Sequence, residues 1–129
     1  MARILIVDDE AETVRMLGQV VRLFGHTPVE ANGWATAEPA IESAMPDLIL
    51  LDLMMPEVDG FEAMQRIRSR PNGRQVPIVV ITASQELDVE ERVADHGGNA
   101  VFRKPISINL LSQVIEDHVT PIEAAAARL

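Results

Sequence analysis

The stretch from Pro46 to Gly60 constrains the fold of this chain more than any other. An unbroken apolar run, Leu48–Leu51, leads directly into Asp52, and the chain then breaks at Pro56 and at Asp59-Gly60. An apolar run without alternation, bounded by turn residues, is typical of a strand buried on both faces of a parallel sheet. Asp52 would then lie at the carboxyl end of that strand, where open α/β sheets bind their ligands.

The rest of the chain alternates between short apolar runs and segments with helical spacing. Four further strands are predicted over Arg3–Val7, Thr27–Glu30, Val76–Ile81 and Ala100–Phe102. Five helices are predicted over Ala11–Phe24, Trp34–Ala44, Asp59–Ile67, about Glu86–His96, and Ser107–His118. This alternation predicts an α/β fold, a doubly wound parallel sheet covered on both faces. One common strand order is 2-1-3-4-5, whose switch point lies between the first and third strands.

Local signals refine the predicted helices. Pro39 falls inside the second helix and removes a backbone donor, so we expect a kink or a late helix start. Asp59 and Glu62 form a capping-box pattern for the third helix, and Ser107 is a predicted N-cap for the last.

The helix predicted over about Glu86–His96 is mostly polar. Its apolar anchors would be Leu87, Val93 and Ala94. So few anchors predict that this helix is the least firmly held element of the fold.

Composition excludes several classes of function. The 129 residues suffice for one domain, and 47% apolar and 24% charged residues are ordinary for a globular protein. The absence of cysteine excludes disulfides and thiolate metal sites. A net charge of −9 argues against direct nucleic-acid binding. No apolar stretch is long enough to span a membrane and no cleavage-like region follows the first residues, so a cytoplasmic location is expected.

Polar residues follow four of the predicted strands at the same edge of the sheet: Asp8 and Asp9, Asp52, Thr82, and Lys104. Three carboxylates in one crevice repel one another unless a cation joins them, and all-oxygen ligands favour Mg²⁺. Lys104 adds a positive charge and Thr82 a hydroxyl, so the crevice could hold a tetrahedral dianion. With no Ser-His or Cys-His pair in view, a carboxylate is the expected nucleophile of a phosphoryl transfer.

Taken singly, most of these residues have an ordinary structural explanation. Asp9 with Glu12 could be a capping box for the first helix. Asp52 could cap a turn, Thr82 could be an ordinary strand residue, and Lys104 a solvated charge. Their common position after apolar strands favours a site, whereas the three histidines show no ligand spacing and are given no catalytic role.

Four motifs carry a resemblance to a known family: Ile-Leu-Ile-Val-Asp8-Asp9-Glu10, Leu-Ile-Leu-Leu-Asp52-Leu-Met-Met-Pro56-Glu-Val-Asp59-Gly60, Ile-Val-Val-Ile-Thr82-Ala83 and Lys104-Pro105-Ile. In this order they resemble the receiver domain of two-component response regulators, over about residues 1–120. The resemblance implies a flavodoxin-like fold. It also implies transfer of a phosphoryl group to Asp52 from a histidine kinase or a histidine phosphotransfer protein.

The resemblance also implies roles for single residues. Mg²⁺ or Mn²⁺ would be bound by Asp9, Asp52 and the main-chain carbonyl of Met54, and by Asp8 through water. Lys104 would contact the phosphoryl group, and Thr82 would move toward it. A cis peptide bond is implied between Lys104 and Pro105.

A conformational switch is expected to follow phosphorylation. Thr82 would draw in the loop that begins with Ala83 and Ser84 and so bias the output surface, formed by the fourth helix, last strand and last helix. In the family an aromatic residue lies three positions before the lysine, where this chain has Val101. Phe102 should point to the other face of its strand, so we expect Thr82 and its loop to carry the switch.

Met54 and Ser84, two residues beyond Asp52 and Thr82, should flank the route of an attacking water. Because the Met54 side chain offers no acid-base group, slow self-dephosphorylation is predicted.

Other classes of protein remain open at this point. A haloacid-dehalogenase-like phosphatase would need an Asp-x-Asp pair that Asp8-Asp9-Glu10 lacks. A non-phosphorylated pseudo-receiver and a flavin-binding module share the fold, but the intact acidic residues argue against the first. The missing Ser/Thr/Gly-rich phosphate loop argues against the second. Residues 121–129 could extend the last helix, begin a linker, or be a cloning remnant; a downstream effector protein or domain and a homodimer are possible partners.

Overall fold

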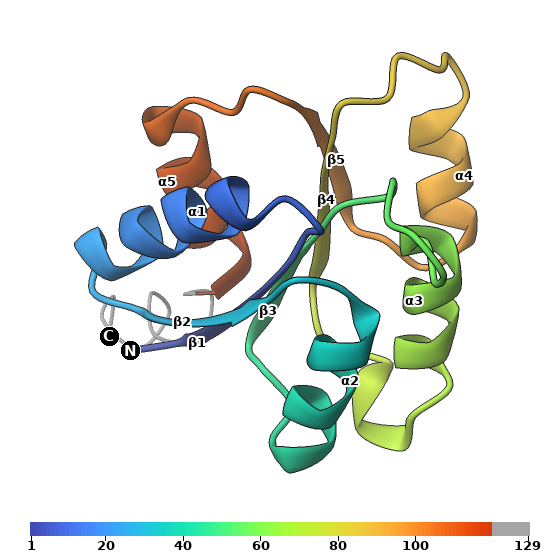
Figure 1. Ribbon diagram of the computed structural model, residues 1–129, viewed down its shortest axis with the longest axis horizontal. Coiled ribbons are helices and arrows are strands. Elements are labelled where there is room, and N and C mark those ends of the chain that lie inside the picture. Colours follow the sequence, from blue (N-terminus) through green and yellow to red (C-terminus); the bar gives the residue numbers. More distant parts are fainter. Residues whose placement is uncertain (120–129) are drawn as a thin grey trace, which may run out of the picture.

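A computed structural model describes residues 1–119 of the chain, and its elements alternate between strand and helix (Figure 1). The strands are β1 (Arg3–Val7), β2 (Thr27–Ala31), β3 (Leu48–Leu51), β4 (Ile78–Thr82) and β5 (Ala100–Arg103). The helices are α1 (Ala11–Leu23), α2 (Trp34–Ser43), α3 (Gly60–Arg68), the short 3₁₀ helix η1 (Pro71–Gly73), α4 (Val89–Asp95) and α5 (Ile108–Val119). The predicted tail, residues 121–129, lies outside the described residues.

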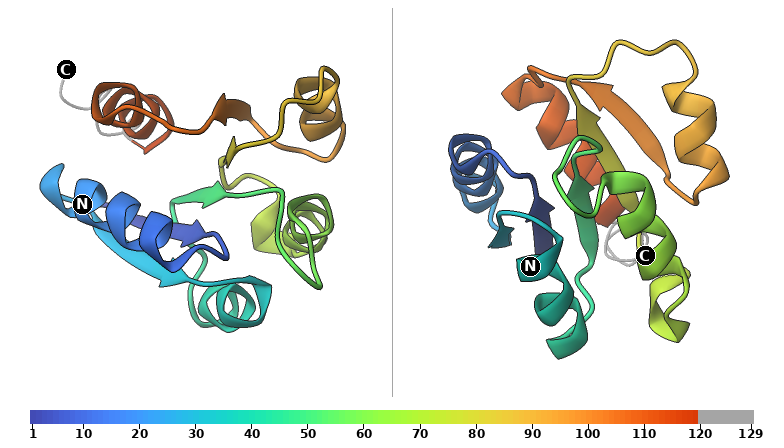
Figure 2. Two further views of the ribbon diagram at one scale, coloured as in Figure 1. Left: turned by 45° about the horizontal axis from the view of Figure 1, so that its top comes forward. Right: turned by 45° about the vertical axis from the view of Figure 1, so that its right-hand side comes forward.

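The five strands form one sheet in the order β2-β1-β3-β4-β5, with every neighbouring pair parallel. The predicted doubly wound, flavodoxin-like fold is therefore confirmed. Helices α1 and α5 cover one face of the sheet, and α2, α3 and α4 cover the other (Figure 2). The carboxyl ends of β1 and β3, which lie side by side at the switch point, therefore open at one edge of the sheet.

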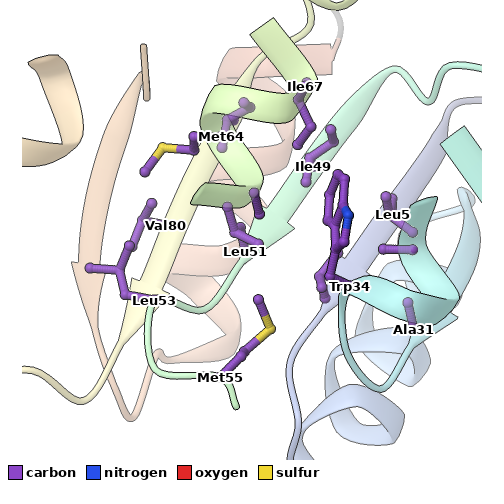
Figure 3. Close-up of a cluster of buried hydrophobic side chains, with 14 of the residues drawn as sticks. Leu5, Ala31, Trp34, Ile49, Leu51, Leu53, Met55, Met64, Ile67 and Val80 are labelled. Carbon is purple, nitrogen blue, oxygen red and sulfur yellow. The ribbon is translucent and has the colours of Figure 1, made fainter. Parts of the chain in front are cut away.

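Strand β3 is buried on both faces, as its unbroken apolar run predicts. Its side chains alternate between two cores. Ile49 and Leu51 enter the core beneath α2, α3 and α4, whereas Leu48 and Leu50 enter the core beneath α1 and α5. Figure 3 shows the first core, in which the Trp34 indole packs beside Ile49 and Leu5. The position of Asp52, directly after β3, thus depends on both cores.

Two of the three helix-start predictions are supported by side-chain bonds. The Asp59 carboxylate accepts a hydrogen bond of 2.9 Å from the backbone N–H of Glu62, and Ser107 Oγ accepts one of 3.1 Å from Leu110. Of the two outcomes expected from Pro39, a kink or a late start, the late start is not found, since α2 begins at Trp34 and contains Pro39. Pro39 is the sixth residue of α2, and without an N–H it cannot donate to the Ala35 carbonyl, so one intrahelical hydrogen bond is lost.

The prediction for α4 is wrong in its start and in two of its three anchors, Leu87 and Ala94. The helix begins at Val89 rather than at Glu86, and Leu87 is fully exposed. Val89 and Val93, four residues apart, are its buried side chains, while Ala94 is exposed. Residues four apart lie on the same face of a helix, so Val89 takes the place that the sequence analysis gave to Leu87.

Candidate functional site

Three carboxylates meet where β1 and β3 end. Asp8, Asp9 and Asp52 each offer an oxygen, and these atoms all lie within 4.8 Å of one another. Asp8 and Asp52 are 2% and 4% exposed, whereas Asp9 faces solvent. Two buried carboxylates and one accessible carboxylate form a hard oxygen-donor set that fits Mg²⁺, and the exposed side leaves room for water ligands.

Lys104, which follows β5, is the only lysine of the chain and reaches into this cluster. Its Nζ lies 2.7 Å from Asp8 Oδ2, 3.2 Å from Glu10 Oε1 and 3.5 Å from Asp52 Oδ2. Partial burial favours such pairing because the competing water is largely removed. The structure therefore brings the predicted lysine onto the predicted carboxylates.

The charges of the site shift its pKa values. Burial, and next the negative charge of Asp8, raise the pKa of the Asp52 carboxyl above its ordinary value, although Lys104 and the Met54 N–H act in the opposite direction. Burial by itself lowers the pKa of Lys104, but the hydrogen bond to Asp8 and the charges of Asp52 and Asp8 outweigh it and raise the pKa. Ionised Asp52 is thus held in an unfavourable place, a common feature of functional sites.

The loop after β3 is folded tightly against Asp52. A Cβ on Gly60 would lie 2.5 Å from the Asp52 carbonyl oxygen and 2.7 Å from Leu53 Cα, so only glycine fits there. Glu57 has a positive φ of 68°, which marks the sharpest point of the turn. Met54 is 62% exposed, and its backbone N–H donates to Asp52 Oδ1 at 3.4 Å. The Met54 side chain is therefore exposed to solvent two residues beyond Asp52.

Thr82 ends β4 and is fully buried. Its Oγ1 accepts a hydrogen bond of 3.2 Å from the Ser84 backbone N–H, and Ser84 Oγ accepts one of 3.3 Å from Glu86. Ala83, between them, is exposed. Side chains that bond the backbone two residues on stabilise a turn only locally. The β4–α4 loop is therefore held by weak, short-range bonds at the residue predicted to move.

A cleft of about 630 Å³ lies beside this loop. Met54, Ala83 and Ser84 line it together with apolar side chains from the start of α3 and from α4, Phe61 and Val89. Arg92 lies over the Phe61 ring at 4.3 Å from its centre, and the His96 ring is 4.9 Å from the same ring. The contacts between α3 and α4 thus include a cation over an aromatic face.

The last strand agrees with two predictions. Val101 packs against the core beneath α2, α3 and α4, and Phe102 packs against the core beneath α1 and α5. The opposite orientation of Phe102 is thereby confirmed. The peptide bond between Lys104 and Pro105 is cis, also as expected. Arg103, which the sequence analysis did not single out, pairs with Glu90 of α4 at 3.0 Å.

Asp9 does not cap α1, because the N-cap position of that helix is Glu10. Glu10 was not predicted to belong to the site, although it contacts Lys104. Its sequence signal was its place directly after the acidic pair. The histidines lie elsewhere: His26 accepts a hydrogen bond from the Ala2 N–H at 3.1 Å, and His118 contacts the Val114 carbonyl oxygen.

None of the helices within residues 1–119 has the length and apolar character that a membrane span requires.

Comparison with known proteins gives the same picture as the geometry. The family described as response regulator receiver domain matches residues 4–116. The transcriptional regulatory protein PdtaR of Mycobacterium tuberculosis is 37% identical over 134 residues, which cover 98% of this chain and 64% of that protein. The phosphate regulon transcriptional regulatory protein PhoB of Escherichia coli is 34% identical over 105 residues, which cover 81% of this chain and 46% of that protein. The chain thus spans less than two thirds of the length of these relatives.

Solved structures are similar over nearly the whole chain. The chemotaxis protein CheY4 of Vibrio cholerae has a TM-score of 0.87 at 23% identity, covering 92% of this chain and 98% of that chain. The signal receiver domain of a DNA binding response regulator from Colwellia psychrerythraea has a TM-score of 0.83 at 29% identity, and the match covers 89% of this chain and 95% of that chain. The shared fold, the acidic cluster and the family match over residues 4–116 agree, and the chain belongs to the response regulator receiver domain family.

Proposed function

We propose that this chain accepts a phosphoryl group on Asp52 from the phosphohistidine of a histidine kinase or histidine phosphotransfer protein. The observation that carries the proposal is the position of Asp52. It is buried at the carboxyl end of β3, within 4.8 Å of the oxygens of Asp8 and Asp9, and Lys104 reaches it at 3.5 Å. A carboxylate held among other carboxylates and one cation is suited to attack phosphorus.

The proposed reaction is an in-line displacement. A carboxylate oxygen of Asp52 forms a bond to phosphorus as the phosphorus–nitrogen bond of the donor breaks, and the imidazole leaves with the bonding electrons. Lys104 would bind a phosphoryl oxygen through its ammonium group. The protein's part is therefore positioning and charge stabilisation rather than acid-base chemistry, and the domain is not a conventional enzyme.

The acidic cluster would hold Mg²⁺, or Mn²⁺ in its place. Asp9, Asp52 and the Met54 carbonyl would bind it directly, and Asp8 through water. When bound, the ion would neutralise charge on the transferred oxygens. The close packing of Gly60 against Asp52 keeps the Met54 backbone near the cluster.

The proposed switch begins at Thr82. The Thr82 hydroxyl would donate to the new phosphoryl group, and Ser84, whose N–H donates to that hydroxyl, would follow it together with Ala83. The change would reach the surface formed by α4, β5 and α5. With Val101 in place of the family's aromatic residue, the β4–α4 loop would carry the signal without a ring rotation.

The larger context is also proposed. Residues 1–120 would form the receiver domain and residues 121–129 a tail or linker. PdtaR and PhoB are transcriptional regulatory proteins. A downstream effector protein or domain, in the cytoplasm, would receive the signal from this chain. A second copy of the chain, in a homodimer, is a further proposed partner.

Mass spectrometry after incubation with acetyl phosphate and Mg²⁺ tests the proposal. Wild type should gain one phosphoryl group, Asp52→Asn should gain none, and Asp8→Asn should retain a measurable gain. Phosphorylation that depends on Asp8 instead of Asp52 would point to a phosphatase-like site, and no gain in wild type would indicate a pseudo-receiver.

A further inference from the structure

Lys104 has three carboxylate partners, and only two of them belong to the proposed site. An ammonium group carries three N–H donors, and Asp8, Glu10 and Asp52 supply one acceptor each, at 2.7, 3.2 and 3.5 Å. Glu10 lies outside the cluster of carboxylates whose oxygens could share a metal. The third partner of the lysine therefore has no role in the function described so far.

Helix capping does not account for Glu10 either. Glu10 occupies the N-cap position of α1, where Ser, Thr, Asp and Asn are the residues that stabilise a helix. It makes no side-chain cap hydrogen bond. Its side chain extends to Lys104 instead, across 94 positions of sequence. A residue that breaks a local rule while making a specific long-range contact points to a functional constraint.

Glu10 also closes a ring of hydrogen bonds with Asp8 and Lys104. The Glu10 backbone N–H donates to Asp8 Oδ1 at 2.9 Å, and Lys104 Nζ donates to Asp8 Oδ2 and to Glu10 Oε1. The side chains of Asp8 and Asp52 are 3% and 5% exposed, whereas that of Glu10 is 65% exposed. Glu10 therefore pulls the ammonium group outward, and the other two acceptors pull it inward.

We propose that Glu10 is a positioning residue for Lys104. It holds the ammonium group at the opening of the site, where the phosphoryl oxygens of a donor arrive, and keeps the lysine from settling entirely onto Asp8 and Asp52. This inference rests on the proposed function, in which Lys104 contacts the phosphoryl group. Glu10 also places a negative charge near an anionic donor. Removing its side chain would therefore combine two opposing effects: the loss of a partner that positions Lys104, and the loss of a charge that repels the donor.

A pair of substitutions separates these effects. Glu10→Gln removes the charge but keeps an acceptor oxygen, and Glu10→Ala removes both. The rate of Asp52 phosphorylation by acetyl phosphate, measured by mass spectrometry at fixed Mg²⁺, should be about three- to tenfold lower in Glu10→Ala than in Glu10→Gln, as for the loss of one charge-assisted hydrogen bond. The matched control is Glu12, an exposed acid in the first turn of α1, whose Gln and Ala variants should not differ.

A second measurement needs neither metal nor donor. Because Lys104 is the only lysine, labelling lysine Nζ with ¹⁵N gives one side-chain ammonium signal. That signal should be similar in wild type and Glu10→Gln, and should shift and exchange faster with water in Glu10→Ala. Equal phosphorylation rates in the two Glu10 variants, or an unchanged ammonium signal in Glu10→Ala, would overturn the inference. If wild type is not phosphorylated on Asp52, the proposed function fails, and the ammonium signal still decides whether Glu10 positions Lys104.

Discussion

Val101 and Phe102 are adjacent in β5, yet their side chains enter different cores. Val101 packs toward α2, α3 and α4, and Phe102 toward α1 and α5. Successive strand residues face opposite sides of a sheet, so Phe102 cannot reach the space between α4 and β5 without a change of strand register.

This relationship predicts how activation spreads. Phe102→Leu should leave the response of the α4 amide signals to fluoroberyllate intact, because Phe102 lies on the other face. Thr82→Ala should reduce that response strongly, since the hydroxyl that would bind the phosphoryl mimic is lost. Amide NMR spectra with and without fluoroberyllate measure both. A fluoroberyllate-bound structure with Phe102 between α4 and β5 would contradict the prediction.

We expect the Met54 side chain to influence the lifetime of the phosphorylated state. Its side chain is exposed two residues beyond Asp52 and has no group that could orient water. Met54→Asn should therefore raise the rate of self-dephosphorylation roughly threefold or more. Loss of phosphoryl label after removal of the donor measures the rate. Met16→Asn, at a half-exposed methionine of α1, is the control and should decay like wild type.

The raised pKa of Asp52 predicts the pH dependence of stability. A carboxyl group whose pKa is higher in the folded state than in the unfolded state binds protons preferentially when folded. Its ionisation therefore lowers stability as pH rises from the unfolded pKa through the folded pKa, and the full penalty applies above both. Without metal, Asp52→Asn should raise Tm by a few degrees at pH 7.5, and this gain should vanish near pH 3.

Thermal unfolding in EDTA, followed by circular dichroism across that pH range, checks this prediction. Added Mg²⁺ should stabilise wild type more than Asp52→Asn, because one of the proposed ligands is missing in the variant. An Asp52→Asn protein less stable than wild type at pH 7.5 without metal would show that Lys104 outweighs burial and Asp8.

We expect Arg68 to make the main polar contribution to the stability of the fold far from the site. Its guanidinium donates to the carbonyl oxygens of Gly97, Gly73 and Val76 at 2.6–3.0 Å and to Asn99 Oδ1 at 3.1 Å. Arg68→Ala should lower the free energy of unfolding by about 2–3 kcal/mol, because several part-buried acceptors lose a charged donor.

Urea unfolding measures the loss at Arg68. Arg66→Ala is the matched control two residues away: its pair with Glu62 is exposed at both side chains and should contribute less than about 0.5 kcal/mol. Phosphorylation of Asp52 should persist in folded Arg68→Ala protein, since Arg68 contacts none of the predicted site residues. A loss as small as that of Arg66→Ala would show that water replaces the arginine at these carbonyls.

The sequence predicted the sheet and the residues at its edge because those features have strong local signals. An apolar run such as Leu48–Leu51, bounded by turn residues, is typical of a doubly buried strand, and a polar residue at its end is easily recognised. The orientation of Phe102 followed from the same strand geometry. These inferences required only the chain order and the alternation of side chains.

The errors and omissions arose where tertiary contacts decide. Leu87 and Val89 are both apolar residues near the start of a helix, and only packing shows that Val89 is the buried one. Arg68 binds backbone carbonyls of loops distant in sequence, which leave no pattern in the residue types. Glu10 was assigned no role because its partner lies 94 positions away.

The contacts of Arg68 have a mechanical consequence for β4. Arg68 and Asn99 fix the chain where this strand begins, since Asn99 Oδ1 also accepts the Ile78 N–H at 2.8 Å. The other end of the strand leads into a loop held by hydrogen bonds that each involve a side chain, including those from Arg92 and Arg103 to Glu86. β4 is thus fixed at its amino end, at Ile78, and less firmly held at its carboxyl end, at Thr82. A displacement of Thr82 can therefore be taken up by a movement of α4. The edge of the sheet that contains the amino ends of the strands, and any segment joined to that edge, then keeps its geometry.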